Sequence, residues 1–294
     1  MSKVNPKIDL VFKKLFGSEE NKDILLSLIN AILPVNEQVA AITLKNPYNI
    51  SDYAEGKLSI LDIKAQAEDG RIFDIEIQIR GSSYYGKRAL FYWAKIFGSQ
   101  LDYAFDETDS NLNISEVGYS DLKKCIVISL MDFNFFQDAR YYRFYTLKDG
   151  DTNEKHKDLD YLDLYFIELK KYQGKLENVK TTLERWITFL NNAHKYDTQK
   201  LPKELAEIKE IRKACQKLDV MFLDEQERQY YESQQKFWLD QNSFLKETLE
   251  KAVEQAEINS KIEIAKNAIK KGLDNQFIAE LTGLSIEQIE ALRN

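Results

Sequence analysis

The sequence predicts an α/β or α+β fold with a mixed sheet, followed by a helical C-terminal region. Segments typical of helices and strands alternate over the first two thirds of the 294 residues. The pair Asp69-Gly70 joins two runs of strand-forming residues, which is a strong hairpin signal. From about Asp219 strand formers become rare, and Glu, Gln, Lys and Ala dominate. We therefore predict two domains, at residues 1–218 and 219–294.

The N-terminal segment predicts two helices and a strand. Residues 7–16 carry apolar side chains at helical spacing. Ser18 is a candidate N-cap for a second helix over residues 19–33, because Ser accepts hydrogen bonds from the first free N–H groups. Residues 38–46 favour a strand.

Residues 58–80 predict a β-hairpin whose two faces differ in polarity. Successive side chains of a strand point to opposite faces. Phe73, Ile75, Ile77 and Ile79 share one face, which we expect to pack in the core. The other face carries two groups of residues, one from each strand: Ile60, Asp62, Lys64 and Gln66, and then Ile72, Asp74, Glu76, Gln78 and Arg80.

An amphipathic helix and further strands follow this hairpin. Residues 82–104 predict a helix with an apolar stripe formed by Leu90, Trp93, Ala94, Phe97 and Leu101. The remaining predicted elements are strands at 123–131, 140–147 and 161–170 and helices at 176–194 and 203–218.

The C-terminal region predicts one long helix, or two in series, over residues 222–271, which contain neither Pro nor Gly. Such a helix needs a partner surface for its apolar residues. Gly272 is a candidate C-cap, and Ser285 with Gln288 forms a capping box, which together give helix–turn–helix spacing. The last helix carries acidic side chains, which repel phosphate, so packing or oligomerisation is favoured there over DNA recognition.

Composition excludes several classes of protein. The net charge is −7, from 41 Lys and Arg against 48 Asp and Glu, which argues against a protein that coats nucleic acid but leaves a nuclease open. No apolar run is long enough to span a bilayer, so we expect no membrane segment. Two His and two Cys disfavour His-based catalysis and zinc sites. Cysteines this few suggest a reducing compartment, and we expect a cytoplasmic protein.

Asp62, Glu76 and Gln78 form the candidate chemical site. Two carboxylates on one face of adjacent antiparallel strands repel each other unless a cation lies between them. Oxygen ligands suit Mg²⁺, which can polarise a phosphodiester and activate a water. Gln78 could position that water, and Lys64 could place positive charge near the phosphate. In the alternative interpretation this face is solvated, and its charges only keep the hairpin soluble.

Three motifs together resemble a known family. The segment LDIKAQAEDGRIFDIEIQIR, followed by YYGKRALFYWAKIFGSQL, is similar to the recombination-promoting nuclease (Rpn) family, also called PD-(D/E)XK nuclease family transposases. The opening residues 9–16 (DLVFKKLF) and the closing residues 279–285 (AELTGLS) resemble the ends of that family. The resemblance spans both ends of the chain, and residues 58–101 carry it most strongly.

The resemblance implies a restriction-endonuclease-like core and metal-dependent DNA cleavage with Mg²⁺, or with Mn²⁺ or Ca²⁺ as alternatives. Asp62 and Glu76 then match the metal-binding acids, with Leu61 in place of the motif proline. Gln78 replaces the motif lysine, so another cation is needed, and Lys64 is the candidate. Reading Asp62-Ile63-Lys64 as the D-x-K motif instead would leave Glu76 and Gln78 without a role.

Further residues and partners follow from the same interpretation. Asp9 is a candidate helix carboxylate that holds a metal-bound water, or else an acid favoured by the helix dipole. Lys87, Arg88 and Lys95 on the helix after the hairpin are candidate DNA contacts. We expect DNA as the partner and a homodimer formed through the C-terminal helices. The alternatives are a non-catalytic DNA-binding or assembly protein on a degenerate nuclease fold, and an enzyme that cleaves RNA.

Overall fold

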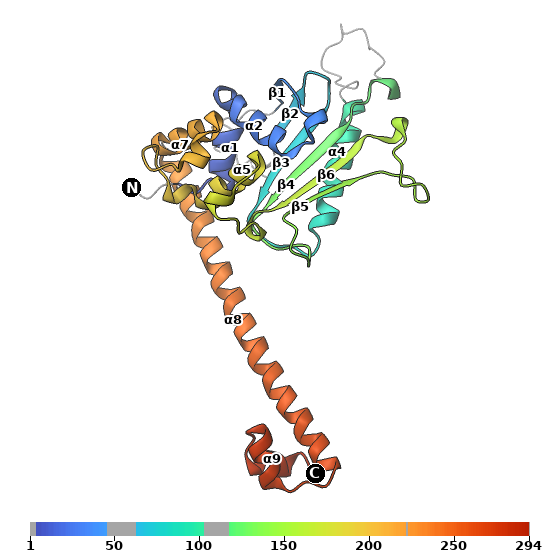
Figure 1. The fold of residues 1–294 in the computed structure, drawn as a ribbon, viewed down its shortest axis with the longest axis vertical. Coiled ribbons are helices and arrows are strands. Elements are labelled where there is room, and N and C mark those ends of the chain that lie inside the picture. The colour runs from blue at the N-terminus through green and yellow to red at the C-terminus, as the bar shows by residue number, and fades with distance from the viewer. Residues whose placement is uncertain (1–3, 46–62, 103–117, 222, 294) are drawn as a thin grey trace. The chain divides into compact units, whose positions relative to one another are not determined.

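The computed structural model describes residues 4–45, 63–102, 118–221 and 223–293 (Figure 1). The chain divides into two compact units, Met1–Tyr231 and Glu232–Asn294. Asp62 and its neighbours at 46–62 lie outside the described residues. No helix in the described part of the chain is both long enough and apolar enough to cross a membrane.

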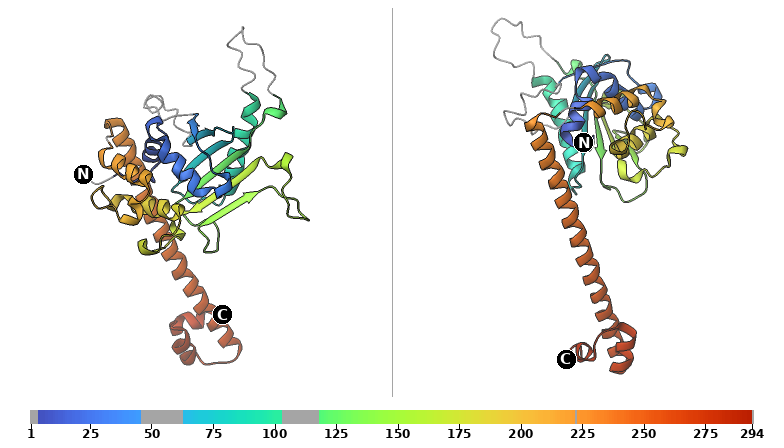
Figure 2. Two further views of the ribbon diagram at one scale, coloured as in Figure 1. Left: turned by 45° about the horizontal axis from the view of Figure 1, so that its top comes forward. Right: turned by 90° about the vertical axis from the view of Figure 1, so that its left-hand side faces the viewer.

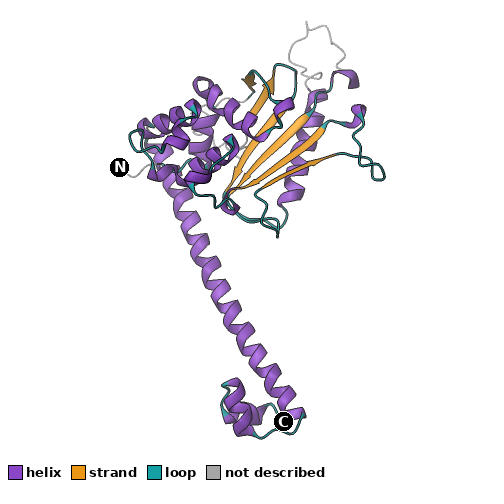
Figure 3. Ribbon diagram, in the orientation of Figure 1, coloured by secondary structure: helices purple, strands orange, loops and turns teal. Residues whose placement is uncertain are grey.

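A six-stranded mixed sheet forms the centre of the first unit (Figure 3). Its spatial order is β1-β2-β3-β4-β6-β5, in which β3, β4 and β6 run parallel and the other neighbours are antiparallel. The predicted mixed sheet is therefore confirmed. The strands are β1 (Ile42–Leu44), β2 (Ile63–Ala67), β3 (Ile72–Gln78), β4 (Cys125–Met131), β5 (Tyr142–Thr146) and β6 (Leu162–Glu168).

The predicted hairpin joins β2 and β3. Gly70 adopts a φ of 90°, which L-residues with a side chain rarely adopt, and its N–H donates to the Ala67 carbonyl at 3.0 Å. The antiparallel register pairs Ile63 with Ile75 and Lys64 with Asp74. Side chains of the two strands therefore share faces as the alternation predicts.

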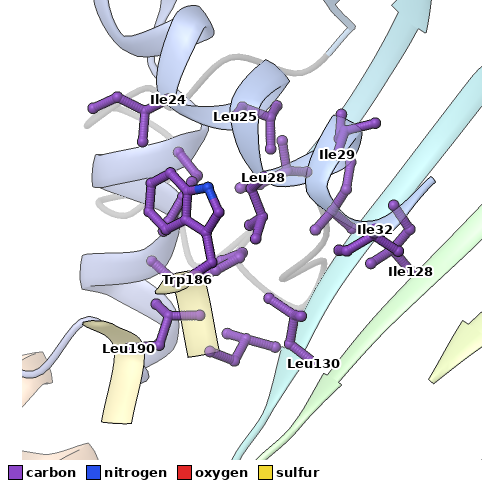
Figure 4. Close-up of a cluster of buried hydrophobic side chains, with 14 of the residues drawn as sticks. Ile24, Leu25, Leu28, Ile29, Ile32, Ile128, Leu130, Trp186 and Leu190 are labelled. Carbon is purple, nitrogen blue, oxygen red and sulfur yellow. The ribbon is translucent and has the colours of Figure 1, made fainter. Parts of the chain in front are cut away.

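One face of the sheet is covered by α1 (Asp9–Phe16), α2 (Lys22–Ile32) and α5 (Thr182–Asn192), and the same core reaches α6 (Lys203–Ala206) and α7 (Lys209–Val220). Figure 4 shows the apolar side chains at this face, where Trp186 lies among leucines and isoleucines of α2 and β4. Its indole Nε1 donates to Ser27 Oγ at 3.2 Å, so its polar atom is satisfied. Ser18 makes no side-chain cap, and the helix predicted from residue 19 starts as a 3-10 turn.

The other face of the sheet is covered by α4 (Tyr85–Asp102) (Figure 2). Tyr85 and Ala89 pack there against apolar residues of β4 and β6. The predicted stripe was partly wrong, because Leu90 is 49% exposed and Ala94 is also exposed. The buried positions are rotated by about one residue around the helix. The small side chain of Ala89 lets α4 lie close to the sheet. Aromatic residues occur on several sides of this helix, so the sequence pattern does not show which side is buried.

The C-terminal region is helical, as predicted. α8 (Glu225–Lys270) is a single helix, followed by α9 (Asn275–Thr282) and α10 (Ile286–Ala291). Gly283 ends α9 with a φ of 70°, and the Ser285–Gln288 capping box begins α10. Ala265, Ala268, Ile278 and Ile289 form the small core of this second unit.

The first compact unit includes the start of α8. Lys14 of α1 forms an ion pair with Glu227 at 2.7 Å, and the Asn5 N–H donates to the Tyr231 hydroxyl at 3.0 Å. Leu223 packs with Ile8 and Leu10. These contacts explain why the division falls after Tyr231 rather than at the 218/219 boundary that composition suggested.

Candidate active site

Strand β3 places Asp74, Glu76 and Gln78 on the sheet face that α4 covers. Their side chains are buried, with Glu76 0% and Gln78 8% exposed. The interpretation of this face as a solvated surface is therefore wrong. A buried carboxylate is costly unless charge and hydrogen bonds compensate it, so its partners define what the site can do.

Among the described residues, Gln78, Tyr85 and Arg88 donate to the Glu76 carboxylate. Gln78 Nε2 donates to Oε1 at 2.6 Å, and the Tyr85 hydroxyl donates to Oε2 at 3.1 Å. Arg88 Nη2 also contacts Oε1 as both a hydrogen bond and an ion pair. Burial and then the Glu76 charge raise the pKa of Tyr85 well above its ordinary value, so this hydroxyl remains a donor.

Arg88 is held by aromatic residues of its own helix. Its Nε donates to the Tyr92 hydroxyl at 3.0 Å, and its guanidinium lies 5.2 Å from the Tyr92 ring centroid and 5.8 Å from that of Tyr85. Burial opposes its charge, but the Glu76 carboxylate and Tyr92 outweigh burial and raise the pKa of Arg88. The Arg88 side chain is nevertheless 37% exposed. It therefore contacts both the buried Glu76 carboxylate and the solvent.

The other predicted site residues are distributed around this cluster. Lys64 is half-buried on β2 opposite Asp74. Asp9 is the first residue of α1 and is half-buried. Burial, followed by the charge of Asp9, raises the pKa of Tyr230, while Arg80 lowers it, so these three groups lie within electrostatic reach of one another. Asp62 lies outside the described residues.

The three predicted DNA contacts of α4 differ in their surroundings. Lys87 and Lys95 are exposed, and Lys87 Nζ lies 5.6 Å from the Tyr84 ring centroid. Arg88 instead points its guanidinium toward Glu76. Positive charge on this helix is thus available both to solvent and to the buried carboxylate.

Sequence reasoning missed two kinds of site residue. Tyr85 and Tyr92 orient Glu76 and Arg88, and the spacing of Tyr85, Arg88 and Tyr92 on one helix side was the available signal. Asp132, directly after β4, is also buried; its N–H donates to the Gln78 carbonyl, and its side chain binds Lys7 at 2.8 Å. It follows an apolar strand, and the pattern gave no sign of it.

The side-chain oxygen atoms near Glu76 are the candidate ligands for a divalent metal ion. Among the described residues, no group of three or more His, Cys, Asp or Glu side chains is placed to share an ion. Glu76 offers the hard oxygen atoms that Mg²⁺ prefers. Its Oε1 already binds the Arg88 guanidinium, so a metal ion held by Glu76 would have to share or displace that contact.

Comparisons with known proteins agree with this architecture. The family model described as PD-(D/E)XK nuclease family transposase matches residues 6–248. A second model, the C-terminal HTH domain of the Rpn/YhgA-like nuclease family, matches residues 259–294. No curated protein and no solved structure matches the chain. The predicted restriction-endonuclease-like core, with its mixed sheet and flanking helices, is confirmed. Since the first match covers most of its length, the chain belongs to the PD-(D/E)XK nuclease family transposases, with an Rpn/YhgA-like C-terminal helix–turn–helix domain.

Proposed function

We propose that the protein is a metal-dependent DNA endonuclease that hydrolyses phosphodiester bonds and promotes recombination. The observation that carries this proposal is the buried Glu76 carboxylate, held by Gln78 and Arg88 on a strand of a nuclease-family sheet. Burying a carboxylate among hydrogen-bond donors does not maximise stability, which favours a chemical role.

The proposed roles follow from the chemistry of each side chain. Asp62 and Glu76 hold Mg²⁺, with Mn²⁺ or Ca²⁺ as alternative ions. The bound ion would polarise the phosphodiester and lower the pKa of a water. Gln78 positions the attacking water, and Lys64 contributes positive charge beside Asp74. Asp9 holds a water at the N-terminus of α1.

DNA is the proposed substrate, with Lys87, Arg88 and Lys95 of α4 as contacts to its backbone. The family of the C-terminal domain supports DNA binding. The exposed acids Glu287 and Glu290 on α10 argue that this last helix does not lie against phosphates. The two cysteines are buried free thiols, which suits the reducing cytoplasm.

We also propose that the C-terminal helices form a homodimer. Exposed apolar side chains line α8 at Leu239, Phe244, Leu249, Val253, Ile258 and Ile264. A two-fold pairing of this helix would cover them and would bring two nuclease sites into one assembly.

The association is testable by light scattering on the full chain. Replacing Phe244 and Leu249 by Lys should convert the dimer to a monomer, because both side chains are mostly exposed in the single chain. The control replaces the exposed Ser243 and Ser260 by Lys, which adds the same charge to α8. Equal masses for both variants would contradict pairing through α8.

The cleavage proposal is testable with supercoiled plasmid. We expect nicking or linearisation with Mg²⁺, none with EDTA, and none by Asp62→Ala. Glu177→Gln, an exposed carboxylate remote in sequence from the hairpin, should cleave like the natural protein. Binding of DNA without metal-dependent cleavage would favour the alternative, a non-catalytic DNA-binding protein, and cleavage of RNA alone would redirect the substrate assignment.

A further inference from the structure

We infer that Arg88 supplies the positive charge that Gln78 lacks, and that it occupies Glu76 until a metal ion displaces it. This inference rests on the proposed nuclease function and assigns Arg88 a more specific role than a contact to the DNA backbone. Lys64 keeps its proposed place beside Asp74, and the positive charge at Glu76 itself comes from Arg88.

The contacts favour Arg88 for this role. Arg88 Nη2 touches the Glu76 carboxylate directly, whereas the strand register pairs Lys64 with Asp74. Gln78 donates to the same Glu76 oxygen as Arg88, so the neutral amide and the guanidinium meet at one atom. Gln78 supplies a hydrogen bond but no charge, and Arg88 supplies both.

The Arg88 guanidinium is anchored at one nitrogen, and another of its nitrogens can donate further hydrogen bonds. Its Nε is anchored on the Tyr92 hydroxyl at 3.0 Å, and Nη2 points to Glu76. Among the described residues, Arg88 Nη1 has no hydrogen-bond acceptor. Arg88 is partly exposed, so rotation about its last bonds can turn this planar group of donors outward without moving α4.

Metal binding and Arg88 release are therefore coupled. Glu76 Oε1 accepts hydrogen bonds from Gln78 and Arg88, which use its two lone-pair directions. If Glu76 held a divalent cation, Arg88 would lose this acceptor and its charge would be repelled. The released guanidinium, still anchored on Tyr92, can then bind an oxygen of the scissile phosphate. Arg88 stays protonated throughout and stabilises the charge that develops on phosphorus-bound oxygens as water adds and the leaving oxygen departs.

Metal affinity in the absence of DNA tests the coupling directly. Arg88→Met replaces the guanidinium by an apolar end on an unbranched side chain, so it removes the charge and the hydrogen bonds to Glu76 and Tyr92. Mn²⁺ binding, measured by electron paramagnetic resonance on the full chain, should tighten by roughly tenfold in this variant, within the usual range of coupling between sites. Arg140→Met, at an exposed ion pair with Asp138, should leave Mn²⁺ binding unchanged.

Cleavage should change in the opposite direction. At saturating Mn²⁺, Arg88→Met should lower the single-turnover rate by roughly a hundredfold, as expected when one charged donor to the transition state is removed. Adding Gln78→Lys to Arg88→Met should restore at least part of the rate, because it returns a cation to the motif position. Tighter metal binding with slower cleavage is not expected if Arg88 only stabilises the fold.

Several outcomes would overturn the inference. Unchanged or weaker Mn²⁺ binding in a folded Arg88→Met protein would show that Arg88 does not compete for Glu76. Should that variant fail to fold, Tyr92→Phe decides, because loss of the hydrogen bond that anchors Arg88 should also tighten Mn²⁺ binding and slow cleavage. If the natural protein cleaves no nucleic acid while Arg88→Met still tightens Mn²⁺ binding, the nuclease proposal fails and the competition at Glu76 stands.

Discussion

The two faces of the central sheet are buried by different means. On the face under α1, α2 and α5, isoleucines of β3 and β4 pack against Trp186 and leucines, and burial of apolar surface stabilises the fold. On the face under α4, the same β3 strand buries Asp74, Glu76 and Gln78. Hydrogen bonds and the Arg88 charge offset the cost of burial there but do not turn it into a large gain. The isoleucines on one side of β3 therefore stabilise the fold, whereas the polar residues on its other side provide the groups for chemistry.

Trp186→Ala should have the largest effect on stability, because it leaves a cavity in the apolar core on this face of the sheet. Deleting a fully buried aromatic side chain costs about 3–5 kcal/mol. Urea denaturation followed by circular dichroism measures this loss. Phe91→Ala, an exposed aromatic on α4, should change the free energy of unfolding by less than about 0.5 kcal/mol. Similar losses for the two variants would contradict the assignment of the core.

Arg88→Met should cost less, about 1–2 kcal/mol without metal. It leaves Glu76 buried without its cation, but Arg88 is itself partly exposed, so the loss is smaller than for a fully buried pair. Added Mn²⁺ should raise the melting temperature of this variant more than that of the natural protein, since the free energy of stabilisation by a ligand rises with the logarithm of its affinity. An equal rise in both proteins would contradict the competition between Arg88 and metal.

Gln78→Ala should slow cleavage by roughly tenfold, because an amide positions water but contributes no charge to the metal. Single-turnover cleavage of plasmid DNA measures the effect. Gln66→Ala on β2 is a matched control, since its amide hydrogen-bonds the Gly70 carbonyl in the hairpin turn. A loss as large as that for Asp62→Ala would mean that Gln78 does more than position a water.

Lys87→Ala should have the smallest effect, a few-fold loss of DNA affinity. A single phosphate contact contributes about one unit to the salt dependence of binding. Fluorescence anisotropy over a series of salt concentrations measures that slope. Lys209→Ala, an exposed lysine of α7 on the opposite side of the sheet, should leave the slope unchanged.

Much of the site could be predicted from local sequence signals. Asp69-Gly70 fixed the hairpin, and strand alternation placed Asp74, Glu76 and Gln78 on one side. These signals depend only on the backbone and on neighbours along the chain. The mixed sheet followed from the order of helix and strand patterns, without any need to know its strand order.

The rest depended on contacts between distant segments. Alternation cannot tell whether a polar face meets water or a helix, so the burial of Glu76 under α4 was not predictable from β3 alone. The side of α4 that packs on the sheet was also missed, because Leu90, Phe91 and Trp93 make several sides of that helix apolar. The hydrogen bond between Arg88 and Glu76 could not be predicted, because it depends on both the burial of Glu76 and the side of α4 that faces the sheet.

The most direct test of the account combines cleavage and stability in one variant, Glu76→Gln. The amide keeps the size of the side chain and can still bond Tyr85, so the melting temperature should stay within a few degrees of that of the natural protein. Mg²⁺-dependent plasmid cleavage by the same sample should fall by roughly a thousandfold, since several kcal/mol of charge stabilisation depend on the metal. A folded Glu76→Gln protein that cleaves at the natural rate would contradict the central claim that the buried carboxylate is the catalytic metal ligand.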